Sequence, residues 1–171
     1  IVTLISGPVT LETPERVKRI DIESAEEMKE HVTANLSDID LFISTAAVAD
    51  FKIKNSEPQK IKKDQSKNMN LSLEKNEDIL KHVSDNNPDL KIVGFAAETE
   101  NMIDNARKKL SSKNLNLIVA NDVSDSSIGF DSNNNEVTLI TEKEELKIPR
   151  ASKEKVARKI VQFISKNILN D

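Results

Sequence analysis

The chain has 171 residues, with 25 Lys and Arg residues against 29 Asp and Glu residues and a formal net charge of -4. This length suits one domain with its own core, and the charge balance argues against a nucleic-acid binder, which would carry a basic stripe. The chain has no cysteine, which excludes disulfides, thiolate chemistry and cysteine-ligated metals and fits a reducing cytoplasm. No apolar run approaches the length of a membrane span and no signal peptide is visible, so we expect a cytoplasmic protein without a membrane partner.

The first 46 residues are expected to hold three strands and one helix. Residues 1–5, 17–22 and 41–46 are apolar or alternating runs typical of strands. Ser24 and Glu27 have the spacing of a capping box, which predicts a helix before the third strand and a parallel strand-helix-strand unit. Residues 1–5 are typical of a buried strand, yet no methionine, cap or turn precedes them. We therefore expect that preceding sequence is missing, with a natural edge strand as the alternative.

A polar, lysine-rich stretch interrupts this pattern. Residues 51–70 have no regular periodicity, and loops of this length in compact domains are usually functional or disordered, so we predict a flexible basic flap. A short strand is expected at Leu71 and Leu73. Asn76 is expected to cap a following helix that carries apolar residues at positions 79, 80 and 83.

The second half continues as alternating strands and helices. Strands are predicted at 91–97 and 115–120, with a helix at 101–110 between them, an antiparallel hairpin from 137–140 and 146–148, and a last helix capped by Ser152. This order predicts an α/β fold with a Rossmann-like, doubly wound, mostly parallel sheet, a small antiparallel hairpin at its edge and the long basic flap. No domain boundary is visible, so residues 1–171 are expected to form a single domain.

Three strand ends share one pattern. In each, an apolar run narrows to alanine and ends on an acid, in the segments Thr45–Asp50, Val93–Glu98 and Ile118–Asp122. Open α/β sheets bind ligands at the carboxyl ends of their strands, and alanines leave room for a ligand to lie across the backbone. The pattern therefore predicts a small-molecule site.

Two candidate residues belong to the first of these ends and to the flap. Asp50 could bind a ribose hydroxyl or a metal-bound phosphate, or it could be a solvated loop residue. Lys60 begins the basic cluster 60–63, which could close over a triphosphate or simply be a solvated surface.

Three further candidates lie in the second of these strands and near the end of the helix that follows it. Lys109 and Lys113 are four residues apart on one helix face and could hold one anion, although their spacing alone favours complementation of a helix C-terminus. Phe95 could stack on a base or be a core residue.

Several absences exclude other chemistries. The chain has only three glycines and lacks both a dinucleotide fingerprint and a Walker loop. It has no tyrosine, which excludes the tyrosine-lysine pair of short-chain reductases, and no cluster of histidine and cysteine that could hold zinc. An oxidoreductase is therefore disfavoured.

Seven segments, in this order along the chain, carry a closer resemblance: Leu4–Val9, Ser24–Met28, Ala46–Phe51, Lys60–Lys63, Asn76–Leu80, Val93–Thr99 and Ala120–Asp122. Together they resemble bacterial phosphopantothenoylcysteine synthetase, a phosphopantothenate–cysteine ligase of coenzyme A biosynthesis. The resemblance implies that CTP, with Mg²⁺, activates 4'-phosphopantothenate as an acyl-cytidylate and that the cysteine amine then displaces CMP. It also implies a homodimer in which the flap reaches towards the partner's site.

The resemblance also implies roles for individual residues. Lys60 is implied to be the catalytic flap lysine that contacts the triphosphate, and the lysine pair of the third helix becomes part of the nucleotide site. The implied CTP contacts are Ala46, Asp50, Lys60, Glu77, Asp78, Ile79, Leu80, Phe95, Lys109 and Lys113. Glu77 stands where the family usually has proline, so backbone contacts are expected there rather than side-chain contacts.

One departure from the family concerns the acid site. The family's glycine-rich first strand-turn and its Asn-Arg-Ser-Ser-Gly segment would lie upstream of Ile1. We therefore expect this chain to be a fragment that holds the nucleotide half and is inactive alone. The alternative is a non-catalytic nucleotide-binding or regulatory module.

Overall fold

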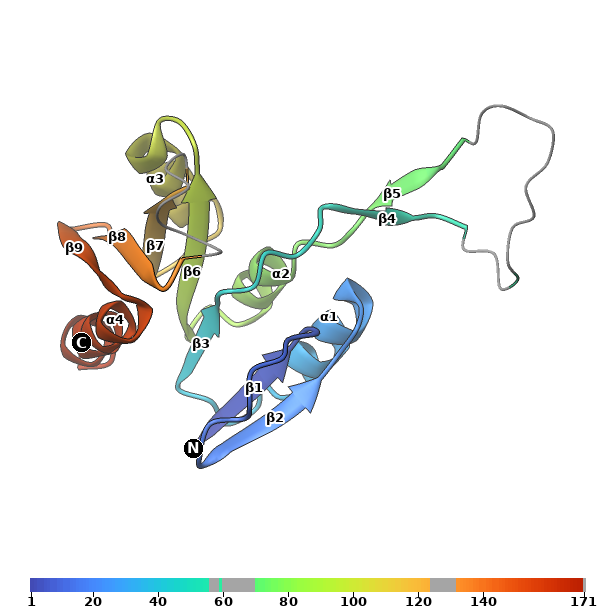
Figure 1. Ribbon diagram of the computed structural model, residues 1–171, viewed down its shortest axis with the longest axis horizontal. Helices are drawn as coiled ribbons and strands as arrows, with labels where there is room; N and C mark the ends of the chain where they lie inside the picture. Colours follow the sequence, from blue (N-terminus) through green and yellow to red (C-terminus); the bar gives the residue numbers. More distant parts are fainter. Residues whose placement is uncertain (56–58, 60–69, 124–131, 171) are drawn as a thin grey trace. The chain divides into compact units, whose positions relative to one another are not determined.

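The computed structural model describes residues 1–55, 59, 70–123 and 132–170 (Figure 1). The elements of these residues, in order, are β1 Val2–Ser6, β2 Val17–Asp21, α1 Ala25–Ala34, β3 Leu41–Ser44, β4 Phe51–Ile53, β5 Leu73–Lys75, α2 Ile79–Asn86, β6 Lys91–Glu98, α3 Met102–Ser112, β7 Leu117–Asp122, β8 Asn134–Ile140, β9 Glu145–Ser152 and α4 Lys153–Asn167. The chain divides into two compact units, Ile1–Leu36 with Ala47–Ile79 and Ser37–Ala46 with Leu80–Asp171.

The first unit contains a parallel pair of strands and a capped helix. β1 and β2 run parallel in register from Val2 opposite Val17 to Ser6 opposite Asp21. The predicted capping box at the start of α1 is confirmed, because Glu27 N donates to Ser24 Oγ at 3.1 Å. The Glu27 carboxylate in turn accepts from Glu23 N at 2.8 Å, so both partners of the box are used.

The prediction of a buried first strand is wrong. Val2 is 57% exposed and Leu4 38% exposed, because within the described ranges β1 pairs only with β2, in a two-stranded sheet that covers little of either strand. The expected strand-helix-strand unit also differs. β2 and β3 belong to different sheets, so α1 connects two sheets rather than neighbouring strands of one.

The predicted flap begins as a regular ribbon. β4 and β5 pair antiparallel, with Ile53 opposite Leu73, and Lys54 N extends the ladder by donating to Ser72 O at 2.9 Å. β4 is a strand that is not predicted from the sequence. The expected short strand at 71–73 lies two residues later. Residues 56–58 and 60–69, which include the basic cluster of the flap, lie outside the described residues.

The second unit is a five-stranded sheet with the order β3-β6-β7-β8-β9. β3, β6 and β7 are parallel, and β8 and β9 add an antiparallel hairpin at the edge, with a bulge between Asn135 and Val137. This confirms the predicted α/β fold with a mostly parallel sheet and a small antiparallel hairpin. β3 ends at Ser44, two residues before the predicted end of that strand.

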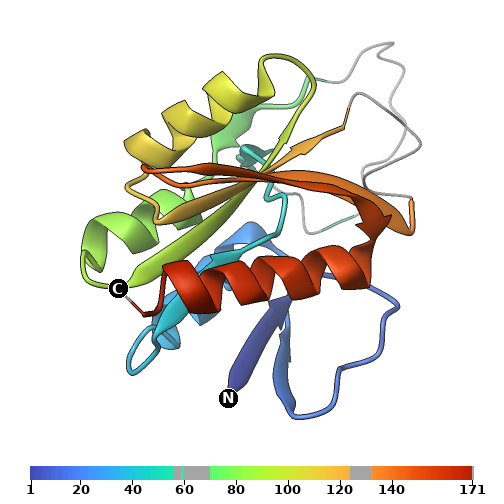
Figure 2. The same cartoon turned by 90° about the vertical axis from the view of Figure 1, so that its left-hand side faces the viewer.

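Helices lie on the two faces of this sheet (Figure 2). One face and α4 share an apolar cluster that includes Val93, Leu117, Leu139, Ile160 and Phe163. Because side chains alternate along a strand, the neighbouring buried residues of the same strands face the opposite side, which α3 contacts. The predicted cap of α4 is confirmed, since Lys155 N donates to Ser152 Oγ at 3.4 Å. No helix of the described ranges is both long and apolar enough to cross a membrane.

Candidate functional site

Small residues line the carboxyl ends of the parallel strands in the second unit. β6 and β7 pair in register, so that Ala96 lies opposite Ala120 and Ala97 opposite Asn121. Ala96 and Ala120 are buried, whereas Ala97 is exposed at the strand end. β3, which leads to Ala46, is parallel to β6 and adjacent to it, so its carboxyl end lies at the same edge of the sheet. This edge is the one at which open α/β sheets bind ligands.

The third helix brings a lysine to this edge. Lys109 Nζ lies 2.6 Å from Glu98 Oε1, at the last residue of β6, and Asn105 Nδ2 donates to Glu98 Oε2 at 3.1 Å. Asn105 and Lys109 are one helical turn apart, so both reach Glu98 from the same face of α3. A positive charge is therefore held beside the strand ends, where an anionic ligand group would need it.

Lys113 lies one further turn along α3. It is the C-cap residue, and its backbone N donates to Lys109 O at 3.0 Å. A lysine at this position also complements the negative end of the helix dipole, as its spacing indicates. The predicted nucleotide contacts of Lys109 and Lys113 stay predictions.

Phe95 lies on the opposite face of β6 from the small residues Gly94 and Ala96. It packs, half-buried, against the apolar cluster that β6 shares with α4. This is the core role that the sequence left open as the alternative to base stacking. The predicted contact between Phe95 and a nucleotide stays a prediction.

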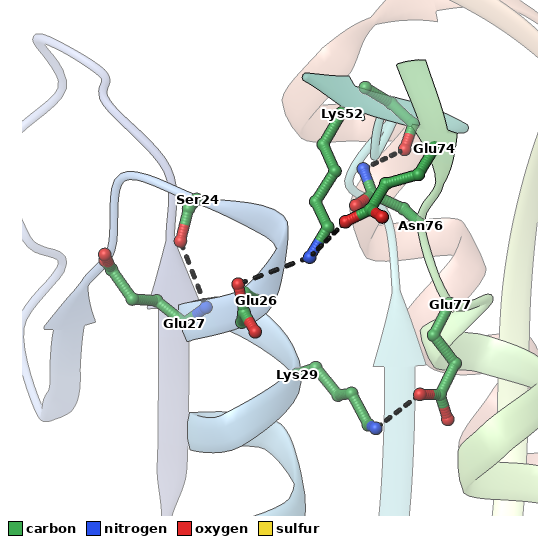
Figure 3. Close-up of polar contacts among 9 residues, drawn as sticks. Ser24, Glu26, Glu27, Lys29, Lys52, Glu74, Asn76 and Glu77 are labelled. Carbon is green, nitrogen blue, oxygen red and sulfur yellow. Dashed lines mark hydrogen bonds and ion pairs between the residues drawn. The ribbon is translucent and has the colours of Figure 1, made fainter. Parts of the chain in front are cut away.

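Residues 77–80 lead from β5 into the first turn of α2. Glu77 and Leu80, at the two ends of this segment, each contact residues of their own unit. In the first unit, Glu77 forms an ion pair with Lys29 (Figure 3). In the second unit, Leu80 packs against the β6 backbone, since a Cβ added to Gly94 would lie 3.1 Å from Leu80 Cδ2. Ile79 is buried with 7% exposure, and Asp78 immediately precedes α2.

Asp50 lies in the first unit, where a side-chain clasp holds its backbone. Asn76 N donates to Asp50 O at 2.8 Å, and Asn76 Nδ2 donates to Ala49 O at 2.8 Å. The prediction that Asn76 caps a helix is wrong, because α2 begins three residues later, at Ile79, and the amide joins the two strands of the ribbon at their base. Asp50 itself is exposed.

The polar face of the ribbon is tied to the first helix. Lys52 Nζ lies 3.4 Å from Glu26 and 3.5 Å from Glu74 (Figure 3). The Glu26 carboxylate, with help from Glu74, raises the pKa of Lys52 above its ordinary value. In the same helix, the Glu23 N–H lowers the pKa of the Glu27 carboxyl, and the Ser24 hydroxyl contributes to the same shift.

A hydrogen-bond acceptor is buried near the carboxyl end of β7. Asn121 Oδ1 is buried and has no hydrogen-bond partner among the described residues. Leaving a buried acceptor unpaired costs free energy, so a donor from water or from a ligand would stabilise this position. Asn121 lies next to Ala120, at the edge of the sheet described above.

A hollow within the second unit lies elsewhere. It has a volume of about 440 Å³ and is lined by residues such as Lys91 and Asn116, at the amino ends of β6 and β7, together with Lys166. It is therefore at the opposite edge of the sheet from the alanine-lined strand ends. Within the described ranges, no group of three or more His, Asp or Glu residues could hold a metal ion.

Comparison with known proteins assigns the family. Residues 1–168 match the family model DFP, described as the DNA/pantothenate metabolism flavoprotein C-terminal domain. The chain belongs to this family. The DFP match covers all the helices and strands labelled in Figure 1.

Similar DFP-family proteins include curated and solved examples. The chain is 46% identical over 167 residues to the coenzyme A biosynthesis bifunctional protein CoaBC of Vibrio vulnificus (strain YJ016), which covers 95% of this chain and 41% of that protein. It is 42% identical over 168 residues to CoaBC of Escherichia coli (strain K12), with the same coverage of 95% and 41%. The crystal structure of the C-terminal domain of CoaBC matches with a TM-score of 0.81 and 35% identity, over 99% of this chain and 76% of that one. The chain thus spans about two fifths of the length of these curated relatives.

The predicted DFP site residues divide between the two units. The first unit holds Asp50 and Glu77, and the second holds Ala46, Leu80 and the α3 lysines. Lys60 and the rest of the basic cluster lie outside the described residues, so the predicted flap lysine stays a prediction.

Glu98 and Asn105 have no role among the residues predicted from the sequence. Glu98 was noted only as the acid that ends the apolar run of β6. The spacing of Asn105 and Lys109, four residues apart on a helix that follows this acid, was the available signal. It indicates two side chains on one face but does not show which strand that face meets.

Proposed function

We propose that this chain is the ligase domain that joins 4'-phosphopantothenate to cysteine in coenzyme A biosynthesis. The observation that carries this proposal is the match to the DFP family across residues 1–168, with curated relatives that are coenzyme A biosynthesis proteins. The lysine held beside the alanine-lined strand ends supports it, because a nucleoside triphosphate needs a cation at the edge of the sheet where it binds.

The chemistry of the proposed reaction requires two steps. A carboxylate is inert to an amine, so the carboxylate oxygen of 4'-phosphopantothenate first attacks the α-phosphorus of CTP, and pyrophosphate leaves. The cysteine amine then attacks the acyl carbon of the acyl-cytidylate, the bond to the CMP oxygen breaks, and the amine loses a proton. The protein's task in both steps is to position the reactants and to offset the charge on the phosphates.

The residues proposed for CTP are those given by the family resemblance: Ala46, Asp50, Lys60, Glu77, Asp78, Ile79, Leu80, Phe95, Lys109 and Lys113. Lys60 is proposed as the lysine that neutralises charge on the triphosphate during activation. Mg²⁺ is proposed to arrive with CTP, because this ion is commonly held by substrate phosphates and few protein ligands.

The proposal is tested by following pyrophosphate and CMP separately. In the intact protein, pyrophosphate release is expected to need CTP, Mg²⁺ and 4'-phosphopantothenate but not cysteine, and CMP release to need cysteine as well. Lys60→Gln is expected to slow pyrophosphate release strongly, by roughly 100-fold or more for a residue that stabilises the transition state. Lys67→Gln, from the same basic loop, is the matched control and is expected to keep the wild-type rate.

Three outcomes would contradict parts of this proposal. Tight CTP binding without pyrophosphate release would indicate a non-catalytic nucleotide-binding module. Faster turnover with ATP than with CTP would contradict the choice of base. An unchanged rate in Lys60→Gln would remove that residue from the mechanism.

We also propose that the protein acts as a homodimer that uses the apolar face of the β4–β5 ribbon. Phe51 and Ile53 alternate with Lys52, Leu73 lies opposite Ile53, and these three apolar side chains are 50–58% exposed. Apolar side chains gathered on one face of a ribbon are typical of an interaction surface. Sedimentation should give a dimer for the wild-type protein and a monomer for a Phe51→Ser/Leu73→Ser variant. A Leu169→Ser variant, whose side chain is exposed just after α4, is the control, and a monomeric wild type would contradict the proposal.

A further inference from the structure

Glu98 is the residue that the structure singles out beyond the proposed CTP contacts. Both of its carboxylate oxygens are used: Oε1 lies 2.6 Å from Lys109 Nζ, and Oε2 accepts from Asn105 Nδ2 at 3.1 Å. Asn105 Nδ2 also donates to Glu100 O at 3.0 Å, which fixes the amide that holds Glu98. The carboxylate is therefore oriented by two side chains of α3, one of which is itself fixed by the segment that follows β6.

The two partners of this ion pair differ in exposure. The side chain of Glu98 is 13% exposed, whereas that of Lys109 is 45% exposed. The carboxylate is therefore the anchored partner, and the ammonium is the one that solvent or a ligand can reach. An ammonium has three N–H donors, so contact with Glu98 leaves others for an incoming anion.

The position of the pair connects it to the site. Glu98 is the last residue of β6, two residues after Ala96, at the edge of the sheet where the alanine-lined strand ends lie. A free lysine side chain samples many rotamers, and ordering it opposes binding. Glu98 restricts the Lys109 side chain before any ligand arrives, so Lys109 loses less conformational entropy when the ligand binds.

We propose that Glu98 is a positioning residue for nucleotide binding: it holds the Lys109 ammonium at the strand ends, ready for a phosphate group. This inference rests on the proposed function, in which Lys109 contacts the triphosphate of CTP. Glu98 acts through Lys109 and not on the nucleotide itself. Its negative charge alone would repel a triphosphate, so the positioning effect and the charge effect predict opposite results when the carboxylate is removed.

The first test is a double-mutant cycle on the dissociation constant of CTP, measured by calorimetry on the intact protein. Glu98→Gln removes the charge but keeps the size, and it is expected to weaken CTP binding by roughly 3- to 10-fold, from the lost ordering of one lysine. In a Lys109→Met background, Glu98→Gln is expected to change the dissociation constant of CTP by less than about 2-fold, because the ammonium that Glu98 positions is absent.

The matched control removes a similar ion pair from the other flank of the same helix. Arg107, on α3, donates through Nε to Glu145 of β9 at 3.0 Å, away from the strand ends of β6 and β7. Glu145→Gln is expected to leave CTP binding unchanged. A loss of affinity equal to that of Glu98→Gln would mean that any ion pair of α3 matters, and would overturn the specific role of Glu98.

The second test needs no nucleotide. Acetic anhydride modifies accessible amines, and a lysine held by a carboxylate reacts more slowly than a free one. Glu98→Gln is expected to raise the modification rate of Lys109 at least about 2-fold, measured by peptide mass spectrometry, while an exposed lysine such as Lys159 on α4 keeps its rate. An unchanged Lys109 rate overturns the inference, whether or not CTP binds.

The outcomes separate the inference from the proposed function. If the wild-type protein does not bind CTP, the proposed function fails, and the modification rate alone decides whether Glu98 holds Lys109. If CTP binds and Glu98→Gln binds it equally or more tightly, the charge effect dominates and the positioning role is overturned. Equal weakening in the presence and absence of Lys109 indicates a general structural role and also overturns it.

Discussion

Adding one methyl group at Gly94 perturbs the packing between β6 and the start of α2. Gly94 is buried, and a Cβ at this position would lie 2.9 Å from Leu115 Cδ1 and 3.1 Å from Leu80 Cδ2. Carbon atoms in contact are separated by about 3.5–4.0 Å, so both leucine side chains must move. Because the clashing atoms are the ends of flexible side chains, the backbone of β6 can stay in place.

The size of the effect follows from two opposing terms. Inserting a methyl group into a packed core costs about 1–3 kcal/mol of stability. Replacing glycine by alanine within a strand stabilises the fold by about 0.5–1 kcal/mol, because alanine loses less backbone entropy on folding. We therefore expect Gly94→Ala to lower the free energy of unfolding by about 1 kcal/mol, measured by urea denaturation. Since Leu80 is one of the proposed CTP contacts, its displacement is also expected to weaken CTP binding.

Two further variants make this prediction specific. Apart from its chain neighbours, no described residue has an atom within 4 Å of a Cβ added at Gly7, so Gly7→Ala is the matched control and is expected to change stability by less than about 0.5 kcal/mol. Leu115→Val shortens one clashing side chain, so its cost should be smaller in the Gly94→Ala background than in the wild type. A Gly94→Ala protein as stable as the wild type, or costs that simply add, would refute the packing described here.

Three other expected outcomes test the fold and its electrostatics. The Glu27 carboxyl has a folded pKa below its ordinary value of 4.5, so its contribution to stability is present above that pH and is lost as the pH falls through the folded pKa. The stability difference between the wild type and Glu27→Gln, measured by denaturation from about pH 6 to pH 3, should therefore shrink below pH 4.5; a constant difference would contradict the shift. Asn76→Ala removes the clasp at the base of the ribbon and should speed hydrogen exchange of the β4 and β5 amides while changing global stability by only about 1 kcal/mol. Unchanged exchange would show that the clasp does not hold the ribbon. Phe163→Ala, in the cluster under α4, should cost about 3–5 kcal/mol, whereas Val161→Ala on the exposed side of the same helix should cost little, and similar costs would place Phe163 outside the core.

The parts of the fold that were predictable depend on local signals. The strands at β6 and β7, the edge hairpin and the capped helix α4 each have a periodicity or a cap that their own residues supply. The capping box of α1 is of the same kind, since Ser24 and Glu27 lie within one turn of each other.

The differences arise where distant residues decide the outcome. β1 has the composition of a buried strand, but burial depends on which elements cover it, and only β2 pairs with it in the described structure. β4 has only three residues, Phe51–Ile53, too few for a periodic pattern, and it becomes a strand because β5 pairs with it from 20 residues further along the chain. Asn76 has the chemistry of a cap but donates to the backbone of Ala49 instead.

The candidate site shows the same division. The alanine-lined strand ends were recognisable from their composition, and their alignment at one edge followed from parallel pairing. The ion pair between Glu98 and Lys109 could not be predicted in this way. It joins a strand end to a helix face, and the two residues are 11 positions apart in the sequence. Charge partners of this kind depend on how a helix is rotated against its sheet, which spacing alone does not give.

The two-faced ribbon of β4 and β5 has a consequence for how the protein's stability is measured. Its polar face is tied to α1 through Lys52, whereas Phe51, Ile53 and Leu73 project from the other face. If two copies cover these side chains mutually, association and folding are linked by mass action, and the melting temperature rises with protein concentration. Melting temperatures of this protein can then be compared only when they are measured at the same protein concentration.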